Sequence, residues 1–463
     1  MNQNPDIQNI VMQVLSKLQG ESSGSKVVFD EDEVEHRVLA AAAAQEVWHR
    51  DYGVERRCQI IAQIRADLRP HAEELAQMAL TETGMGNLAD KITKKKLAIE
   101  KTPGPESITA RAITGDKGLV LEEYAPYGVI ASITPSTNPV ATIIHNCICM
   151  ISGGNAVVFA PHPNAVRCTL KTVEIIAETL RCCGAPEGLV SALNKPSMEN
   201  LEKLMKHPKV RLISATGGPG VVDAALRSGK PAIGAGPGNP PVLVDETADL
   251  NKAAIGVVNG AAFDNNLLCV CEIELIVVNC VADELKKRML ENGAHELKDR
   301  NQIELLKKAI INEKGGVNKA FVGKDATYIL EKIGIKVPAS VRLILVETDE
   351  SHPFVQEELL MPVLPMIRVP NFQEGLAMAK RVEHGFHHSA VIYSTNIDHM
   401  SVMAREMETT MFVKNAPAYA SLGADSDCPV TLTIATATGQ GATAPASFCR
   451  LRRCVLHGAF RII

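Results

Sequence analysis

Short apolar runs alternate with longer amphipathic stretches through most of the chain. Between residues 128 and 214 the apolar runs are rich in β-branched residues, and stretches of helical periodicity separate them. This pattern is typical of strands that alternate with helices in a parallel sheet covered on both faces. We predict strands at 128–134, 156–160, 189–193 and 210–214, with helices ending near residues 152 and 183.

The pattern differs on either side of this region. Residues 30–100 have helical periodicity, and residues 114–127 are predicted to form a β-hairpin. Residues 434–463 are glycine- and threonine-rich, then basic and apolar, so we expect them to return to the first domain or to pair with a neighbouring subunit. A second α/β unit is expected at 245–433, beginning with a helix at 251–263, a strand at 274–278 and a helix at 282–292.

Residues 1–18 are predicted to form a separate amphipathic helix. Asn4 can cap it, Pro5 suits its first position, and residues 19–26 (QGESSGSK) resemble a flexible linker. A helix tethered in this way is expected to dock in a groove on a partner. The alternative is that it folds back onto the body of the protein or frays. Its apolar stripe consists of Ile7, Ile10, Val11, Val14, Leu15 and Leu18.

Composition and charge exclude several classes of protein. The chain has 463 residues, 46% of them hydrophobic, and a formal net charge of −5. We therefore expect a large core over two or three domains and no electrostatic footprint for nucleic acid. No apolar run approaches the roughly 20 residues that span a bilayer, and residues 1–20 lack the features of a signal peptide. A cytoplasmic protein with reduced cysteines and no membrane partner is expected.

No metal site is predicted. The twelve cysteines form no C-x-x-C pair, and His387 and His388 have no ligands at metal-binding spacing, although they could line a substrate pocket. Residues 94–96 are three lysines that could meet cofactor phosphates, but a solvated face is the commoner role of such a cluster.

Two kinds of loop could carry chemistry. Residues 214–220 (SATGGPG) and 234–241 (GAGPGNPP) are glycine-rich turns that could let the backbone approach a phosphate, or could simply be tight turns. Residues 263–272 (FDNNLLCVCE) could form a nucleophile loop, in which backbone N–H groups and asparagine amides stabilise a thiolate and an oxyanion. A buried, inert cysteine is the alternative, and Cys269 and Cys271 compete for the role of nucleophile.

The whole chain resembles the coenzyme-A-acylating branch of the aldehyde dehydrogenase superfamily, especially its members from bacterial microcompartments. The resemblance implies a Rossmann-type nucleotide-binding domain at 27–244 with an oligomerisation hairpin at 112–127. It also implies an α/β catalytic domain at 245–433 and an oligomerisation role for 434–463. The motifs that carry the resemblance are ETGMG (82–86), TPSTNP (134–139), GNAVVFAPHP (154–163), GAGPGNPPVLVDETADL (234–250), FDNNLLC (263–269), EELLMPVLP (357–365) and RLRRCVL (450–456).

The resemblance assigns roles to particular residues. Cys269 matches the catalytic cysteine, whereas Cys271 does not align with it. Thr137 or Asn138 would supply the oxyanion donor beside the Cys269 backbone N–H, and Asn138 is preferred for its side-chain amide. Glu358 matches the glutamate that holds the nicotinamide ribose, and His162 could replace the usual ribose-binding lysine. The residues expected to contact the cofactor are Thr134, Pro135, His162, Thr216, Gly217, Gly218, Gly236 and Glu358.

One departure from the family pattern indicates the acyl acceptor. Hydrolytic members carry a glutamate that activates water, but the matching residues 233–238 (IGAGPG) contain no carboxylate. A thioacyl enzyme without that base should hydrolyse slowly, whereas a thiol is partly ionised near neutral pH and needs less help. Coenzyme A is therefore the expected acceptor, and the glycines at 236 and 238 would make room for it.

The resemblance thus implies NAD-dependent, CoA-acylating oxidation of a short aliphatic aldehyde, propanal or acetaldehyde. It further implies a homodimer or homotetramer in a microcompartment lumen, with residues 1–18 bound to a shell protein as an encapsulation peptide. Two alternatives remain open. One is a phosphate-acylating semialdehyde dehydrogenase with the same thioacyl chemistry, and the other is a catalytically idle interaction protein of the microcompartment.

Overall fold

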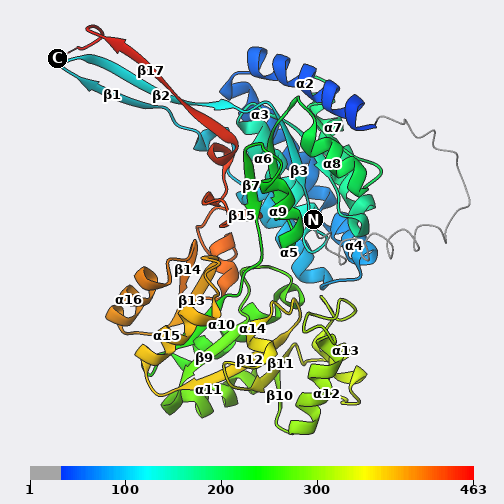
Figure 1. Ribbon diagram of the computed structural model, residues 1–463, viewed down its shortest axis with the longest axis vertical. Coiled ribbons are helices and arrows are strands. Elements are labelled where there is room, and N and C mark those ends of the chain that lie inside the picture. The colour runs from blue at the N-terminus through cyan, green and yellow to red at the C-terminus, as the bar shows by residue number, and fades with distance from the viewer. Residues whose placement is uncertain (1–32, 463) are drawn as a thin grey trace, which may run out of the picture.

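The computed structural model describes residues 33–462. Two α/β domains lie one above the other, and a three-stranded antiparallel sheet projects from the first, with the C-terminus near its tip (Figure 1). The predicted helix at 1–18 and linker at 19–26 lie outside the described residues. Within the described part, no helix has both the length and the apolar character needed to cross a bilayer.

Four helices open the first domain, as their periodicity predicted. Gly84, with a φ of 65°, ends α4 in the left-handed region, and the Asn87 side chain accepts the Asp90 N–H to cap α5. Trp48 is fully buried, and its Nε1 donates to the Ile151 carbonyl at 2.9 Å. The helices are α2 (Glu33–Asp51), α3 (Val54–Leu68), α4 (Ala72–Thr83) and α5 (Leu88–Lys101).

The first sheet has five parallel strands in the order β5-β4-β3-β6-β7. The predicted alternation of strands and helices is confirmed. The chain winds outward from β3 in both directions, so the gap between β3 and β6 is the switch point at which such sheets bind ligands. Its elements are β3 (Val129–Ile133), α6 (Pro139–Ser152), β4 (Ala156–Ala160), α7 (Val166–Cys182), β5 (Val190–Ala192), α8 (Met198–Lys206), β6 (Val210–Thr216), α9 (Pro219–Leu226) and β7 (Ala232–Ala235).

The second sheet has seven parallel strands in the order β10-β11-β12-β9-β8-β13-β14. It corrects the predicted domain boundary at 244/245, because residues 241–244 form β8, which pairs with β9 and β13. Its strands are β8 (Pro241–Val244), β9 (Glu274–Val278), β10 (Ala294–Leu297), β11 (Leu343–Glu347), β12 (Val363–Val369), β13 (Ser389–Tyr393) and β14 (Met411–Lys414). Its helices are α10 (Leu250–Ala262), α11 (Asn279–Glu291), α12 (Arg300–Ile310), α13 (Ala326–Lys332), α14 (Pro353–Gln356), α15 (Phe372–Val382) and α16 (Ile397–Met407).

The C-terminal segment runs back to the first domain. After β15 (Ile434–Ala435) and β16 (Gly441–Ala442), strand β17 (Cys449–His457) pairs antiparallel with β2 (Gly118–Pro126), which in turn pairs with β1 (Arg111–Gly115). Every residue of β1 is exposed, and so are all residues of β17 after the first.

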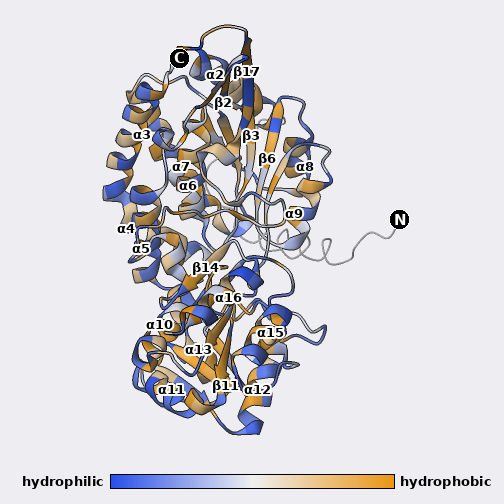
Figure 2. Cartoon of the chain, turned by 90° about the vertical axis from the view of Figure 1, so that its left-hand side faces the viewer, coloured by the Kyte–Doolittle hydropathy of each residue, from blue (hydrophilic) through white to orange (hydrophobic). Residues whose placement is uncertain are grey.

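Hydrophobic residues are concentrated in the strands and on the inward faces of the helices, and hydrophilic residues cover the outer faces (Figure 2). Both central strands, β3 and β9, are buried along their whole length, as expected for parallel strands covered on both faces.

Candidate active site

Two sheet edges supply the predicted site residues. Thr134 and Pro135 follow β3, His162 follows β4, and Thr216 ends β6, so all four lie at the carboxyl edge of the first sheet. The second domain contributes from the opposite kind of edge, because its site residues precede their strands. Gly238 lies before β8, Cys269 before β9, Glu358 before β12 and His388 before β13.

The glycine-rich turns at the carboxyl edge of the first sheet, which we call the cofactor edge, leave open space around the backbone. A Cβ atom added at Gly217, Gly218 or Gly236 would meet no atom within 4 Å. Gly218 is the N-cap of α9 and Pro219 its first residue, which has no N–H. The Val221 N–H donates to the Gly218 carbonyl at 3.1 Å, so in this turn the Gly220 N–H remains to bind phosphate. The arrangement fits the diphosphate of a nicotinamide dinucleotide, which needs close approach to backbone amides.

The remaining cofactor-edge residues are held by few side-chain contacts. Thr134 is buried, and its backbone N–H donates to the Ala160 carbonyl at 3.1 Å. Pro135 is partly exposed beside it. The Thr216 hydroxyl pairs with that of Thr433 at 3.1 Å, so the segment that leads back to the first domain also supports this edge.

His162 does not supply the positive charge that a ribose-binding lysine would carry. Its Nδ1 accepts the Asn164 N–H at 3.1 Å and so caps the 3₁₀ turn η3 (Pro163–Ala165). Burial, and then the positive charge of Lys319, lowers the His162 pKa, so the ring is neutral at physiological pH. With Nδ1 acting as an acceptor, Nε2–H remains as a neutral donor for a ribose hydroxyl.

The nucleophile loop, residues 263–272, owes its shape to its polar residues. Asp264, Asn265 and Asn266 have φ angles of 46°, 56° and 61°, and asparagine and aspartate tolerate this left-handed region better than most residues. The Asn266 amide donates to the carbonyls of Ala261 and Glu272, both at 2.9 Å, and so closes the loop. The aspartate and asparagines of FDNN therefore shape this loop, whereas its role as a nucleophile loop stays a prediction.

Cys269 and Cys271 occupy different environments in this loop. Cys271 is fully buried in an apolar cluster, which holds its pKa far above the usual range of a thiol. Cys269 is partly exposed. Although part of the residue reaches the surface, its thiol is surrounded by protein. Desolvation of the thiol, and then the negative charge of Glu358, raises the Cys269 pKa to about 12, whereas Lys94 opposes this shift. Of the two thiols, only Cys269 is placed to meet a substrate.

The two candidate oxyanion donors also differ in their contacts. Asn138 is the N-cap of α6, and its Nδ2 donates to the Leu267 carbonyl at 3.1 Å, two residues before Cys269. The Thr137 side chain is partly exposed and has no hydrogen-bond partner among residues 33–462. The geometry therefore favours Asn138, whose amide is tied to the nucleophile loop.

Gly238 is packed rather than open. A Cβ atom there would lie 2.8 Å from the His388 ring and 2.9 Å from the Cys269 carbonyl oxygen. The glycine therefore brings the chain against the nucleophile loop, and the expectation that it makes room for coenzyme A applies to Gly236 alone. His388 is buried and bonded to Ser389 at 2.8 Å, whereas His387 is exposed with a φ of 53°.

Glu358 lies beside Gly238, whose N–H approaches its Oε1 at 3.5 Å. Burial raises the Glu358 pKa to about 7, so the carboxyl group is poised between its two states near neutral pH. The negative charge of Glu358 raises the pKa of the Cys269 thiol. Residues 233–238, by contrast, contain no carboxylate.

A buried lysine cluster, Lys91, Lys94 and Lys95 of α5, was missed by the sequence reasoning. Lys94 and Lys95 are only 4% and 3% exposed, so neither lies on a solvated face, and Lys96 alone of 94–96 is exposed. Lys91 and Lys94 both bind the Asp264 carboxylate. Burial, and then the charge of Lys94, lowers the Lys91 pKa to about 8. Lysines at helical spacing on one face, beside an apolar stripe, were the available signal.

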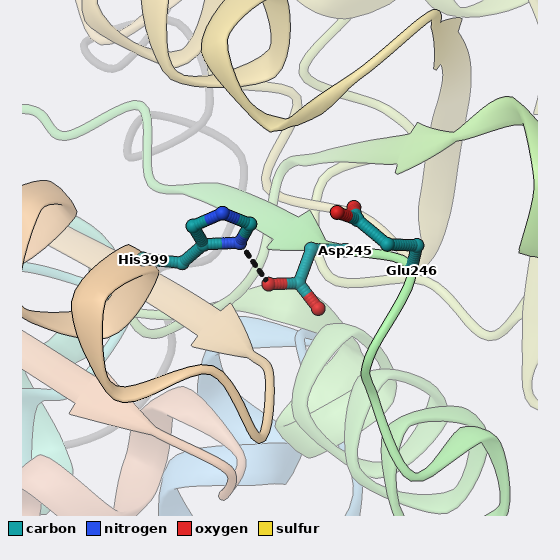
Figure 3. A group of neighbouring side chains, drawn as sticks. All are labelled: Asp245, Glu246 and His399. Atoms are coloured by element: carbon teal, nitrogen blue, oxygen red, sulfur yellow. Dashed lines mark hydrogen bonds and ion pairs between the residues drawn. The ribbon is translucent and has the colours of Figure 1, made fainter.

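Asp245, Glu246 and His399 form a separate group of potential metal ligands, with ligand atoms within 4.8 Å of one another (Figure 3). Asp245 follows β8, so the group lies at the carboxyl edge of the second sheet, opposite the nucleophile loop. Both Asp245 oxygens are already engaged. One accepts from the Thr247 N–H and hydroxyl, and the other from Ser394 and from His399 Nδ1 at 2.8 Å. Hydrogen bonding accounts for this group without an ion.

A partly exposed cysteine on a hydrogen-bonded loop, joined through Asn138 to the carboxyl edge of a Rossmann-type sheet, is the arrangement expected of an enzyme that forms a covalent thiol intermediate. The chain belongs to the aldehyde dehydrogenase family, which it matches over residues 6–424.

Individual relatives are similar along nearly the whole chain. Acetaldehyde dehydrogenase (acetylating) EutE of Salmonella typhimurium is 44% identical, with both sequences fully covered. The structure of Rhodopseudomonas palustris propionaldehyde dehydrogenase with bound CoA and an acylated cysteine has a TM-score of 0.90 and 47% identity, covering 92% of this chain and 97% of that one. A propionaldehyde dehydrogenase from the fucose utilisation microcompartment of Clostridium phytofermentans has a TM-score of 0.91 and 45% identity, covering 94% and 99%.

Proposed function

We propose that the chain oxidises a short aliphatic aldehyde, propanal or acetaldehyde, to its CoA thioester, with NAD⁺ as the oxidant and Cys269 as the nucleophile. The observation that carries this proposal is the pairing of a partly exposed cysteine with a carboxylate-free segment at 233–238. The acylating relatives, similar over the whole chain, support CoA rather than phosphate as the acceptor. They also weigh against an idle interaction protein.

Each residue then has a defined task. The Cys269 thiolate attacks the aldehyde carbon, so that a C–S bond forms and the carbonyl electron pair moves to oxygen. The Asn138 amide and the Cys269 backbone N–H hold that oxyanion. NAD⁺, when bound, supplies the acceptor for the hydride that leaves the same carbon. The open turns at Gly217, Gly218 and Gly236 would hold its phosphates, and Glu358 its nicotinamide ribose.

The second half of the cycle is a thioester exchange. The thiolate of coenzyme A attacks the acyl carbon, the bond to Cys269 breaks, and the cysteine returns as a thiolate. Without a carboxylate at 233–238, no side chain of that segment can deprotonate a competing water. The step exchanges one thioester for another, so it should be readily reversible.

Assembly and location follow from surfaces away from the site. The β1-β2-β17 sheet, with exposed Ile113, Leu451 and Val455, would join subunits into a dimer or tetramer. The relative from a fucose utilisation microcompartment supports a compartment lumen as the location. Residues 1–18 would then bind a shell protein, and deleting them should leave turnover intact while the enzyme no longer co-purifies with shells.

The decisive test measures NADH formation from propanal and NAD⁺, with and without coenzyme A. We expect strong dependence on coenzyme A and loss of turnover by at least about 1,000-fold in Cys269→Ala. Cys271→Ala is the matched control, because it removes a neighbouring thiol of the same loop and should keep most activity. Equal rates without coenzyme A would contradict the acyl-transfer proposal, and activity in Cys269→Ala would contradict the nucleophile.

A further inference from the structure

The Lys94 ammonium lies between the nucleophile loop and the Asn138 amide. Its helix, α5, is at the end of the first domain that faces the second (Figure 1). The side chain is buried, and its Nζ donates to Asp264 Oδ2 and to Asn138 Oδ1. A buried ammonium with two oxygen partners is held in a single place, so it can in turn fix the groups that it contacts.

These contacts determine which way the Asn138 amide points. Lysine can only donate hydrogen bonds and a backbone carbonyl can only accept them. Oδ1 must therefore face Lys94, and Nδ2 must face the Leu267 carbonyl, 3.1 Å away. A flipped amide would set two donors against each other on one side and two acceptors on the other. One Nδ2 proton is used by Leu267, and the second remains for another acceptor.

Asp264 keeps the ammonium of Lys94 in position. Its Oδ2 also accepts from Lys91 at 3.2 Å, and its Oδ1 accepts the Asn87 N–H at 2.9 Å. The Asp264 N–H donates to Asp90 at 2.8 Å. The nucleophile loop is thus bonded to the start of α5 from both sides, and Lys94 transmits that fixed position to the amide.

We propose that Lys94 is the positioning residue of the oxyanion hole, holding the Asn138 amide with Nδ2 turned toward the nucleophile loop. This inference rests on the proposed function, which assigns the oxyanion to Asn138. When the thiolate adds to the aldehyde, negative charge develops on the carbonyl oxygen, and a pre-oriented N–H stabilises it with no rearrangement. Lys94 itself transfers no proton and touches no substrate.

The role differs from a purely structural one in what it predicts. A structural lysine would lower the thermal stability without a specific link to Asn138. A positioning lysine acts through Asn138, so once that amide is gone its removal should add only the small decrease in Cys269 thiolate that follows from losing the Lys94 charge. A double-mutant cycle on kcat measures this link directly.

The experiment compares Lys94→Met, Asn138→Ala and the double variant in the full-length enzyme, with propanal, NAD⁺ and coenzyme A. Asn138→Ala should lower kcat by roughly 100- to 1,000-fold, as for other lost oxyanion donors. Lys94→Met should lower kcat by roughly 10- to 100-fold with little change in the aldehyde KM, and the double variant should match Asn138→Ala within about threefold. Lys96→Met, on the exposed side of the same helix, is the matched control and should retain normal turnover.

Each outcome has one meaning. Near-normal kcat in Asn138→Ala would overturn the oxyanion assignment and this inference with it. Loss in Asn138→Ala but normal kcat in Lys94→Met, or losses that multiply in the double variant, would overturn this inference alone. Asp264 stays paired with Lys91 when Lys94 is replaced, which favours folding. If Lys94→Met is insoluble, Lys94→Ala completes the same cycle, because it also removes the N–H donor to Asn138 Oδ1.

Discussion

The cofactor edge and the nucleophile loop meet at one site but are built in opposite ways. At the cofactor edge, Gly217, Gly218 and Gly236 leave open space around the backbone. In the nucleophile loop, Asp264 and Asn266 are buried, and each accepts or donates several hydrogen bonds. A cycle in which one carrier leaves and another enters needs an open edge, whereas a nucleophile must stay within a fraction of an ångström of its place.

The largest effect should come from removing the charge that anchors the nucleophile loop. Asp264→Ala would leave the Lys91 and Lys94 ammonium groups buried without their shared counter-ion. We expect the free energy of unfolding to fall by about 3 to 5 kcal/mol, as for other broken buried pairs. Urea denaturation would measure it.

Thr216→Val supplies the comparison from the cofactor edge. It deletes one hydroxyl hydrogen bond, to Thr433, and should lower the free energy of unfolding by only about 1 kcal/mol. Similar losses in the two variants would mean that the two regions are equally rigid and that the contrast between them is wrong.

Much of this fold follows from the sequence pattern, and the reasons are local. Short apolar runs rich in β-branched residues, such as 156–160, favour buried strands by their length and composition. Gly84 and Asn87 end and begin helices by backbone and capping chemistry. The β8 strand was assigned to the wrong domain because its run, 241–244, looks the same in either sheet. Only its partners, β9 and β13, decide where it belongs.

The site residues also divide into those that one continuous segment reveals and those that depend on contacts between distant segments. Cys269 and the glycine turns were predicted because their motifs lie in continuous segments. The Lys94 contacts could not be predicted, because Asp264 lies 170 residues away along the chain. A lysine on a helix is normally solvated, and only the packing of α5 against the nucleophile loop buries it. The tight packing of Gly238 was missed for the same reason, since His388 comes from a distant loop.

A matched glycine pair tests whether the two regions differ in packing. Gly238→Ala would press a methyl group against the His388 ring and the Cys269 carbonyl, at 2.8 Å and 2.9 Å. The displaced nucleophile should lower kcat by about 100-fold. Gly236→Ala adds the same methyl group, two residues away, where the protein itself leaves open space, and should keep the free energy of unfolding within about 0.5 kcal/mol of the wild type. Gly238→Ala should lower that free energy by about 1 to 3 kcal/mol through overpacking. Steady-state kinetics with propanal would measure kcat in Gly238→Ala, and urea denaturation would compare the stability of both variants. An equal loss of stability in Gly236→Ala would show that the cofactor edge is also tightly packed.

The smallest expected effect concerns the electrostatic link between the two regions. The Glu358 charge raises the Cys269 pKa, so Glu358→Gln should lower that pKa and increase the thiolate fraction at a given pH. The rate of alkylation by iodoacetamide, measured without cofactor at pH 8, should rise by roughly three- to tenfold, since one pKa unit is a tenfold change in thiolate. Glu357→Gln, one residue away, is the matched control and should react like the wild type.

The pH dependence fixes the sign of this effect. Glu358 itself has a pKa of about 7, so below that pH it becomes neutral in the wild type as well. The rates of wild type and Glu358→Gln should therefore converge by about pH 6 and separate as the pH rises above 7. A ratio that is constant with pH would mean that Glu358→Gln acts by opening access to the thiol rather than through charge. A ratio of one throughout would place the Glu358 charge outside the field of the nucleophile.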